Sequence, residues 1–272
     1  MGRIRAMGRM GLALASVAMM SAVLGAIQLV SVSDEIAIGK QAQAEIKRQT
    51  PELTDSTVTS YVARVGRQLA AHARGATYPY SFSVANYREI NAFALPGGPV
   101  WVNRGAIAAA ANESQLAAVL AHEVAHVAQR HSAKQLSNAL VTNLGLNLLG
   151  ALLGNSGGAN AANIAARYVA SGAFLKFSRD DERDADRVGA QIMARAGWDP
   201  RGMIELMQTI REQEKRDPGS VEVFFSNHPS PKDRITLLQR SIPRSRGKRD
   251  SPQFQSVRER LRSLPPARSM AR

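Results

Sequence analysis

Apolar residues in the first half of the chain recur at helical spacing. Between residues 34 and 71 they fall mostly three or four positions apart, so that they share one side of a helix. They are Ile36, Ile38, Ala42 and Ile46, followed by Val58, Tyr61, Val62, Val65 and Leu69. The pattern predicts a helical stretch that packs one face against a core.

The pattern changes between residues 80 and 103. Residues 80–84 (YSFSV) alternate apolar and polar side chains, which is typical of a half-buried strand. Residues 91–95 and 100–102 flank a Pro-Gly-Gly turn, and this arrangement predicts a β-hairpin.

Helical spacing returns after residue 111. Asn112 followed by Gln115 is typical of a capped helix start, and the next apolar residues form one stripe. They are Leu116, Val119, Leu120, Val124 and Val127. Two further helices are predicted over residues 178–195 and 200–214. The predicted fold class is α+β, mostly helical, with a small antiparallel sheet beside the helix that starts near Asn112.

The N-terminal residues have the pattern of an export signal. Residues 1–9 carry three arginines and no acid, and residues 12–26 contain no charge. This length fits a signal peptide or a membrane anchor, while a buried helix is the alternative. Ser31 and Ser33 are small residues at the positions that a signal peptidase reads. Either export interpretation places residues 34–242, the predicted catalytic domain, in the periplasm or on the outer face of the cytoplasmic membrane.

The formal charge of +13 comes from the two ends of the chain. Residues 240–272 hold ten Lys and Arg against two acids, and the part between the ends is close to neutral. This distribution argues against a nucleic-acid-binding face, as does the aromatic content of 5%. Residues 243–272 are predicted to be a basic, disordered tail that contacts anionic lipids, so membrane association is expected at both ends.

The segment His122-Glu123-Val124-Ala125-His126 carries the main chemical signal. Two histidines four residues apart on a helix project from the same side, one turn apart, and can share a tetrahedral zinc. Glu123 can then accept a proton from water that zinc activates. Because the chain has no cysteine, thiolate ligands and disulfides are excluded.

A catalytic zinc needs a third protein ligand. The histidines at positions 72, 131 and 228 are candidates, together with the carboxylates of the acidic segment 178–186. Glu182 and Asp186 stand one helical turn apart, so one can bind the metal while the other orients a ligand histidine. On its own, this acidic segment is more typical of a solvated helix face than of a metal site.

Several separated motifs resemble the gluzincin zinc metallopeptidases of HtpX and BepA type. Besides the HExxH segment, they are residues 34–39 (DEIAIG), 91–98 (NAFALPGG), 182–189 (ERDADRVG), 197–200 (GWDP), 228–229 (HP) and 234–235 (RI). The resemblance implies that Glu182 is the third ligand and that Asp186 is the partner of a ligand histidine, His122. It implies one zinc per chain, and it matches neither His72 nor His131 to a ligand position.

The same resemblance implies how substrate binds. The strand of Asn91, Ala92, Phe93 and Ala94 is expected to pair, main chain to main chain, with an extended substrate. The expected activity is endopeptidase cleavage of unfolded or misassembled envelope proteins, as protein quality control. BepA-like proteins append a helical-repeat domain, whereas only a basic segment of about 30 residues follows Ile242 here. HtpX has several membrane spans that this chain does not match, so a periplasmic domain is expected.

Two alternative functions stay open. One is a chaperone-like or latent protein of the envelope that keeps zinc but cuts little. The other is a basic adaptor with a structural zinc site, against which Glu123 argues because a structural site needs no general base.

His228 has three possible roles in this sequence. It can be a loop histidine held by a carboxylate, a donor that stabilises the oxyanion, or a fourth ligand that fills the open zinc position and keeps the enzyme inactive. BepA-like relatives suggest the fourth-ligand role, and we expect it here.

Overall fold

The computed structural model describes residues 30–139, 141, 176–228, 234–242 and 246–270. Residues 1–29 of the predicted export signal, most of the apolar run over residues 136–153 and the Gly/Asn-rich stretch at 154–163 lie outside these residues. Within the described part of the chain, we find no helix with the length and hydrophobicity needed to cross a membrane.

The molecule contains one small three-stranded sheet in the part that the structure describes. Its strands are β1 (Ser81–Ala85), β2 (Ala92–Ala94) and β3 (Pro99–Asn103), in the order β1-β3-β2. The predicted hairpin is confirmed, because β2 and β3 pair antiparallel. The sheet is mixed rather than wholly antiparallel, since β1 pairs parallel with β3. The chain reverses direction before β2 and again before β3, and it is β3 that lies next to β1.

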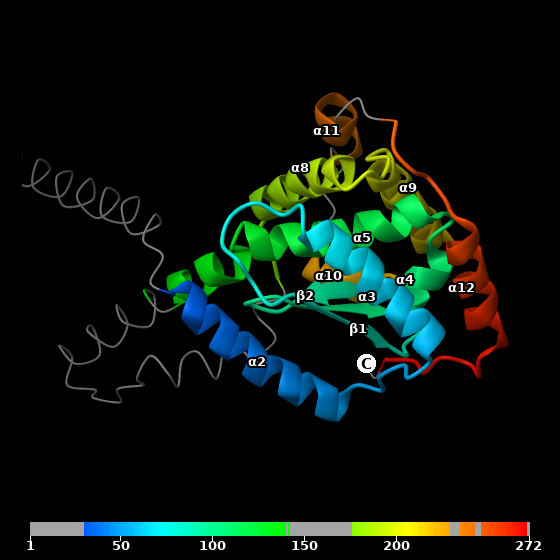
Figure 1. The fold of residues 1–272 in the computed structure, drawn as a ribbon, viewed down its shortest axis with the longest axis horizontal. Coiled ribbons are helices and arrows are strands. Elements are labelled where there is room, and N and C mark those ends of the chain that lie inside the picture. Colours follow the sequence, from blue (N-terminus) through cyan, green and yellow to red (C-terminus); the bar gives the residue numbers. More distant parts are fainter. Residues whose placement is uncertain (1–29, 140, 142–175, 229–233, 243–245, 271–272) are drawn as a thin grey trace, which may run out of the picture.

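Helix α5 (Glu113–Ala128) occupies the centre of the molecule and is buried along its whole length. The Asn112 side chain caps it by accepting a hydrogen bond from the Gln115 N–H at 3.0 Å. The helix packs against α3, α8, α9 and strand β2, and Figure 1 shows it between α8 and the sheet. The apolar stripe predicted from the sequence is therefore only part of its buried surface. Five alanines between residues 117 and 128 let neighbours approach on the remaining sides.

Two helices form the stretch predicted over residues 34–71. They are α2 (Val32–Gln49) and α3 (Ser56–Ala70), and Pro51 lies in the break between them. The start of α2 packs closely on the hairpin turn. Gly97 has a φ of 74°, and a Cβ there would lie 2.4 Å from the Ile36 Cα, so the turn needs glycine for both reasons.

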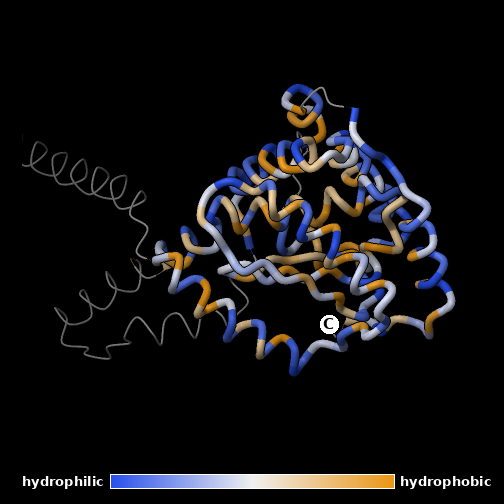
Figure 2. The backbone as a smooth tube through the Cα atoms, viewed as in Figure 1, coloured by the Kyte–Doolittle hydropathy of each residue, from blue (hydrophilic) through white to orange (hydrophobic). Residues whose placement is uncertain are grey.

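Further helices lie around α5 and its neighbours. They are α4 (Arg104–Ala109), α8 (Arg179–Arg195), α9 (Gly202–Arg216), the short 3₁₀ turn η2 (Pro218–Ser220), α10 (Glu222–Asn227) and α11 (Arg234–Ser241). The two helices predicted over residues 178–195 and 200–214 are confirmed as α8 and α9. Figure 2 shows hydrophobic residues concentrated on α5 and on the neighbouring strands, with hydrophilic residues on the outer helices.

The prediction of a disordered C-terminal tail is wrong for the residues that the structure describes. Residues 252–263 form α12 (Pro252–Ser263), which buries Phe254, Val257 and Leu261 against the body. Beyond the helix, Arg88 N–H donates to the Arg268 carbonyl at 2.9 Å, so the chain end runs beside residues 86–88. Three apolar residues on one face of a helix give enough buried surface to order an otherwise basic segment.

Candidate metal centre

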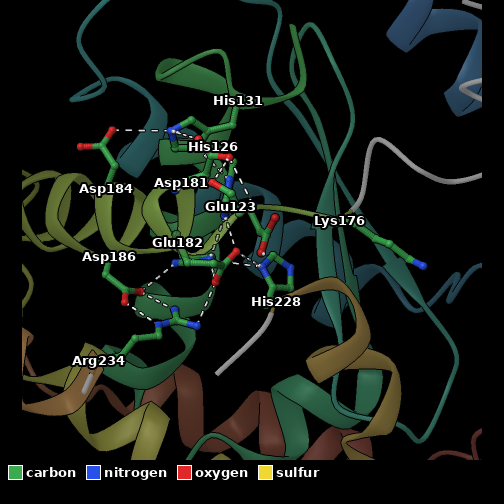
Figure 3. A network of polar contacts seen from close by, with 12 residues as sticks. Glu123, His126, His131, Lys176, Asp181, Glu182, Asp184, Asp186, His228 and Arg234 are labelled. Carbon is green, nitrogen blue, oxygen red and sulfur yellow. Dashed lines mark hydrogen bonds and ion pairs between the residues drawn. The ribbon is translucent and has the colours of Figure 1, made fainter. Parts of the chain in front are cut away.

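Three histidines and one carboxylate converge at the centre of the molecule. His122 and His126 lie on α5, Glu182 on α8, and His228 directly after α10. Figure 3 shows three of them, His126, Glu182 and His228, close together. All four are buried, and one possible ligand atom from each lies within 4.8 Å of those of the other three. The structure thus brings together residues that are up to 106 positions apart in the chain.

The spacing of these atoms fits a shared metal ion. His122 Nε2 lies 3.0 Å from His126 Nε2 and 3.4 Å from His228 Nδ1. Glu182 Oε1 lies 2.9 Å from His228 Nδ1 and 3.3 Å from His126 Nε2. Ligand atoms about 2.0–2.1 Å from a tetrahedral zinc are separated by about 3.4 Å. Imidazole nitrogens and a carboxylate directed at one point are a ligand set that suits zinc.

Two capped helices bring these residues together. Ser178 caps α8, accepting from the Asp181 N–H at 3.1 Å while the Asp181 side chain accepts in return. Gly189 lies where α8 crosses α5, because a Cβ there would come within 3.2 Å of the Ala121 backbone. The inward face of α8 therefore carries its carboxylates directly onto α5.

Asp186 lies behind His122. Its Oδ1 is 3.1 Å from His122 Nδ1, on the opposite side of the ring from the metal-facing Nε2. Burial disfavours the charged carboxylate, but Arg234 and His122 outweigh it, so the pKa of Asp186 lies below its ordinary value. Burial also disfavours imidazolium at His122, yet the contacts with Asp186 and Glu182 raise its pKa to about 10. Asp186 thus lies where the resemblance implies a partner of His122.

Arg234 contacts two of the carboxylates of α8, Asp186 and Glu182. Its Nε and Nη2 donate to Asp186 at 2.7 and 2.6 Å, and its Nη1 lies 2.8 Å from Glu182 Oε2. The guanidinium is 2% exposed. Contacts with His228 and His122 overcome burial and hold the pKa of Glu182 well below its ordinary value. Arg234 belongs to one of the motifs that resemble the family, but only the fold shows what its side chain contacts.

Glu123 lies beside the four converging residues without joining them. Its Oε1 is 3.6 Å from His228 Nε2, the nitrogen that points away from Glu182. Burial raises the pKa of Glu123, while His228, His122 and a backbone hydrogen bond with Ala94 oppose that rise. The Ala94 contact links this carboxylate to β2, which is an edge strand of the sheet as expected. Asn91, just before β2, is buried, and its side-chain oxygen has no hydrogen-bond partner.

The two remaining histidines differ from each other. His72 is exposed, and its backbone is hydrogen-bonded: the carbonyl accepts from Arg195 and the N–H donates to the Leu69 carbonyl. His131 is buried, and its Nδ1 lies 2.9 Å from His126 Nδ1. His131 is not among the four converging residues, in agreement with the absence of a matching ligand position in the sequence. The sequence did not indicate its contact with His126. The five-residue separation of His126 and His131 crosses a helix end, so periodicity could not indicate it.

Comparison with known proteins agrees with this geometry. Residues 56–242 match the model of Peptidase family M48. The chain is 32% identical over 212 residues to the beta-barrel assembly-enhancing protease of Escherichia coli K12, covering 75% of this chain and 43% of that protein. It is also 32% identical over 209 residues to the mitochondrial metalloendopeptidase OMA1 of Schizosaccharomyces pombe, covering 74% of this chain and 60% of that protein.

The matched region spans less than half the length of the Escherichia coli relative. Residues 56–242, which match the family model, make up more than half of this chain. They include the four converging residues His122, His126, Glu182 and His228. The chain belongs to peptidase family M48.

Proposed function

We propose that this protein is a zinc-dependent endopeptidase that cuts unfolded or misassembled proteins of the cell envelope. The observation that carries the proposal is the position of Glu123, a buried carboxylate beside a set of three histidines and one glutamate and next to the edge strand β2. A purely structural metal site has no use for such a group. The names of the relatives, protease and metalloendopeptidase, agree with it.

His122, His126 and Glu182 would hold the zinc, which when bound acts as a Lewis acid on the substrate carbonyl. Glu123 takes a proton from the attacking water and delivers it to the leaving amine. Because burial raises its pKa, Glu123 is a stronger base than an exposed glutamate. The open side of β2 would pair with the substrate main chain along Asn91, Ala92, Phe93 and Ala94. Such pairing selects extended chains, which favours unfolded over folded substrates.

The test uses the conservative variant Glu123→Gln, which keeps the size of the side chain and removes the base. Casein cleavage should fall by orders of magnitude, while zinc content stays that of the wild type. A chelator should abolish wild-type cleavage, and added zinc should restore it. Wild-type rates from the Gln variant would overturn the mechanism. A wild-type protein that holds zinc and binds casein without cutting it would favour the chaperone-like alternative.

We further propose that His228 is an inhibitory fourth ligand. Its Nδ1 is close to both Glu182 and His122, and its ring is fully buried against Phe224, with centroids 5.1 Å apart. His228→Ala should then raise basal casein cleavage or produce self-cleavage, with zinc still bound. Slower cleavage with unchanged zinc content would instead assign His228 to stabilising the oxyanion. No change in either would leave it a structural histidine.

The proposed location outside the cytoplasmic membrane depends on residues 1–33. Fusing these residues to a phosphatase that is active only outside the cytoplasm tests it directly. Active phosphatase would support export, and its absence would contradict it. Replacing Arg3, Arg5 and Arg9 by glutamine in the same fusion should weaken the orientation signal.

A further inference from the structure

His131 contacts His126 at Nδ1, the ring nitrogen that does not face the other converging residues. Its Nδ1 lies 2.9 Å from His126 Nδ1, and the two rings meet edge to face, with centroids 4.9 Å apart (Figure 3). His131 is 5% exposed and His126 is 1% exposed, so water does not compete for this contact. Phe177 covers another side of His126, stacked with centroids 3.8 Å apart.

The geometry determines where the protons lie when a metal is bound. The Nε2 of His126 faces His122 and Glu182, so this nitrogen offers its lone pair to the metal. The proton of the neutral ring must then be on Nδ1, which faces His131. His131 Nδ1 is therefore the acceptor, and its own proton lies on Nε2. That nitrogen faces Asp184 Oδ2 at 3.6 Å and Asp181 Oδ1 at 3.9 Å.

The backbone after α5 is bent so that His131 can reach back. Arg130 has a φ of 59°, in the left-handed region that non-glycine residues seldom adopt. Its guanidinium donates to Glu35 at 2.6 Å and to the Val30 carbonyl at 2.6 Å. Glu35 is 1% exposed and also accepts from the Tyr78 hydroxyl at 3.1 Å. The beginning of α2 thus holds the turn that places His131.

We propose that His131 is a positioning residue, which fixes the ring orientation and proton position of the ligand His126. The inference rests on the proposed zinc site. His122 has a comparable partner in Asp186, so each α5 ligand is held from behind by a different side chain. Such outer contacts usually change metal affinity by about 10–100-fold.

The experiment compares two variants of similar size. His131→Asn keeps an acceptor oxygen at the δ position, whereas His131→Leu removes it; His72→Leu, at an exposed histidine, is the control. Zinc affinity is measured by competition with a chelator, and the cobalt-substituted protein reports ligand geometry through its visible absorption. We expect His131→Leu to bind zinc about 10–100-fold more weakly with an altered cobalt spectrum, and His131→Asn to restore both. His72→Leu should match the wild type.

Wild-type affinity and spectrum in His131→Leu would overturn the proposal, as would an asparagine variant as weak as the leucine variant. Thermal unfolding of the metal-free variants identifies a purely structural role, which would lower stability while leaving zinc affinity unchanged. His131→Met serves as the apolar variant where leucine does not fold, because its side chain adapts to irregular space. A wild-type protein that binds zinc but cuts no casein defeats the proposed activity and leaves this inference standing. Equal zinc affinities in the wild type and His131→Leu, together with casein cleavage by the wild type, would contradict this inference but not the proposed activity.

Discussion

The metal centre and the C-terminal segment, residues 246–270, both carry many charged side chains and stabilise them in opposite ways. In the metal centre the charges are buried and held by one another, as Arg234 is by Asp186 and Glu182. The C-terminal segment leaves charges such as Arg260 at the surface and attaches itself through three buried apolar residues. Net charge therefore does not decide whether a segment is ordered. A segment is ordered when its buried charges are paired with opposite charges and its buried apolar side chains pack against other apolar groups.

One buried cation outside the C-terminal segment is held by that segment. Arg104, at the start of α4, is 8% exposed and donates to the Pro265 carbonyl at 2.6 Å and the Leu264 carbonyl at 3.3 Å. Backbone carbonyls of the C-terminal segment thus satisfy a charge of the body. This contact makes the segment part of the folded domain rather than the disordered tail that its composition predicts.

The largest effect should come from removing a partner within the metal centre. Glu182→Ala deletes the carboxylate that faces His126 and His228, so we expect the purified protein to lose its zinc. Elemental analysis after dialysis measures this, with circular dichroism to verify folding. Asp180→Ala is the matched control, on the same helix but with a side chain 86% exposed. Tightly held stoichiometric zinc in Glu182→Ala would place the third ligand elsewhere.

A large effect on stability should follow from removing an apolar anchor of the C-terminal segment. Phe254 is fully buried, and its ring lies 6.2 Å from that of Tyr61. Phe254→Ala should lower the free energy of unfolding by about 3–5 kcal/mol, the usual cost of emptying such a site. Urea denaturation measures this, with the exposed Gln253→Ala as control. A change below about 1 kcal/mol would mean that the segment contributes little to the core.

The smallest effect should come from a surface ion pair of the same segment. Asp55 caps α3 and lies 2.9 Å from Arg260 Nε. Asp55→Asn keeps the cap acceptor and removes the charge, so the free energy of unfolding should fall by less than about 1 kcal/mol at neutral pH.

The pH dependence of that small difference has a definite sign. Burial opposes the charge of Asp55, but Arg260 and the Val58 N–H outweigh it and lower its pKa in the folded protein. The charged group therefore stabilises the fold above the unfolded-state pKa of about 3.9. That stability is lost as the pH falls through the folded pKa, so wild type and Asp55→Asn should converge in acid. A difference that stays constant would assign the effect to the cap hydrogen bond.

Part of the site follows from local geometry, and the sequence was sufficient for it. The helical repeat places His122 and His126 one turn apart wherever α5 packs, and Asn112 indicates where that helix begins. The Pro-Gly-Gly turn predicts the hairpin for the same reason, because its backbone requirement is local. These features depend on neighbours within a few residues, and no distant contact can change the spacing.

The rest was decided by packing between distant segments. Glu182 and Asp186 belong to an acidic segment that is, on its own, more typical of a solvated surface. Only the crossing of α8 over α5 at Gly189 buries them. The contact of His131 with His126 needs a left-handed turn at Arg130, which Glu35 holds from about 95 residues away. The order of α12 depends on a hydrophobic surface that α3 provides. The free energy of such contacts depends on two whole surfaces that pack together. Composition and periodicity within one segment therefore do not predict them.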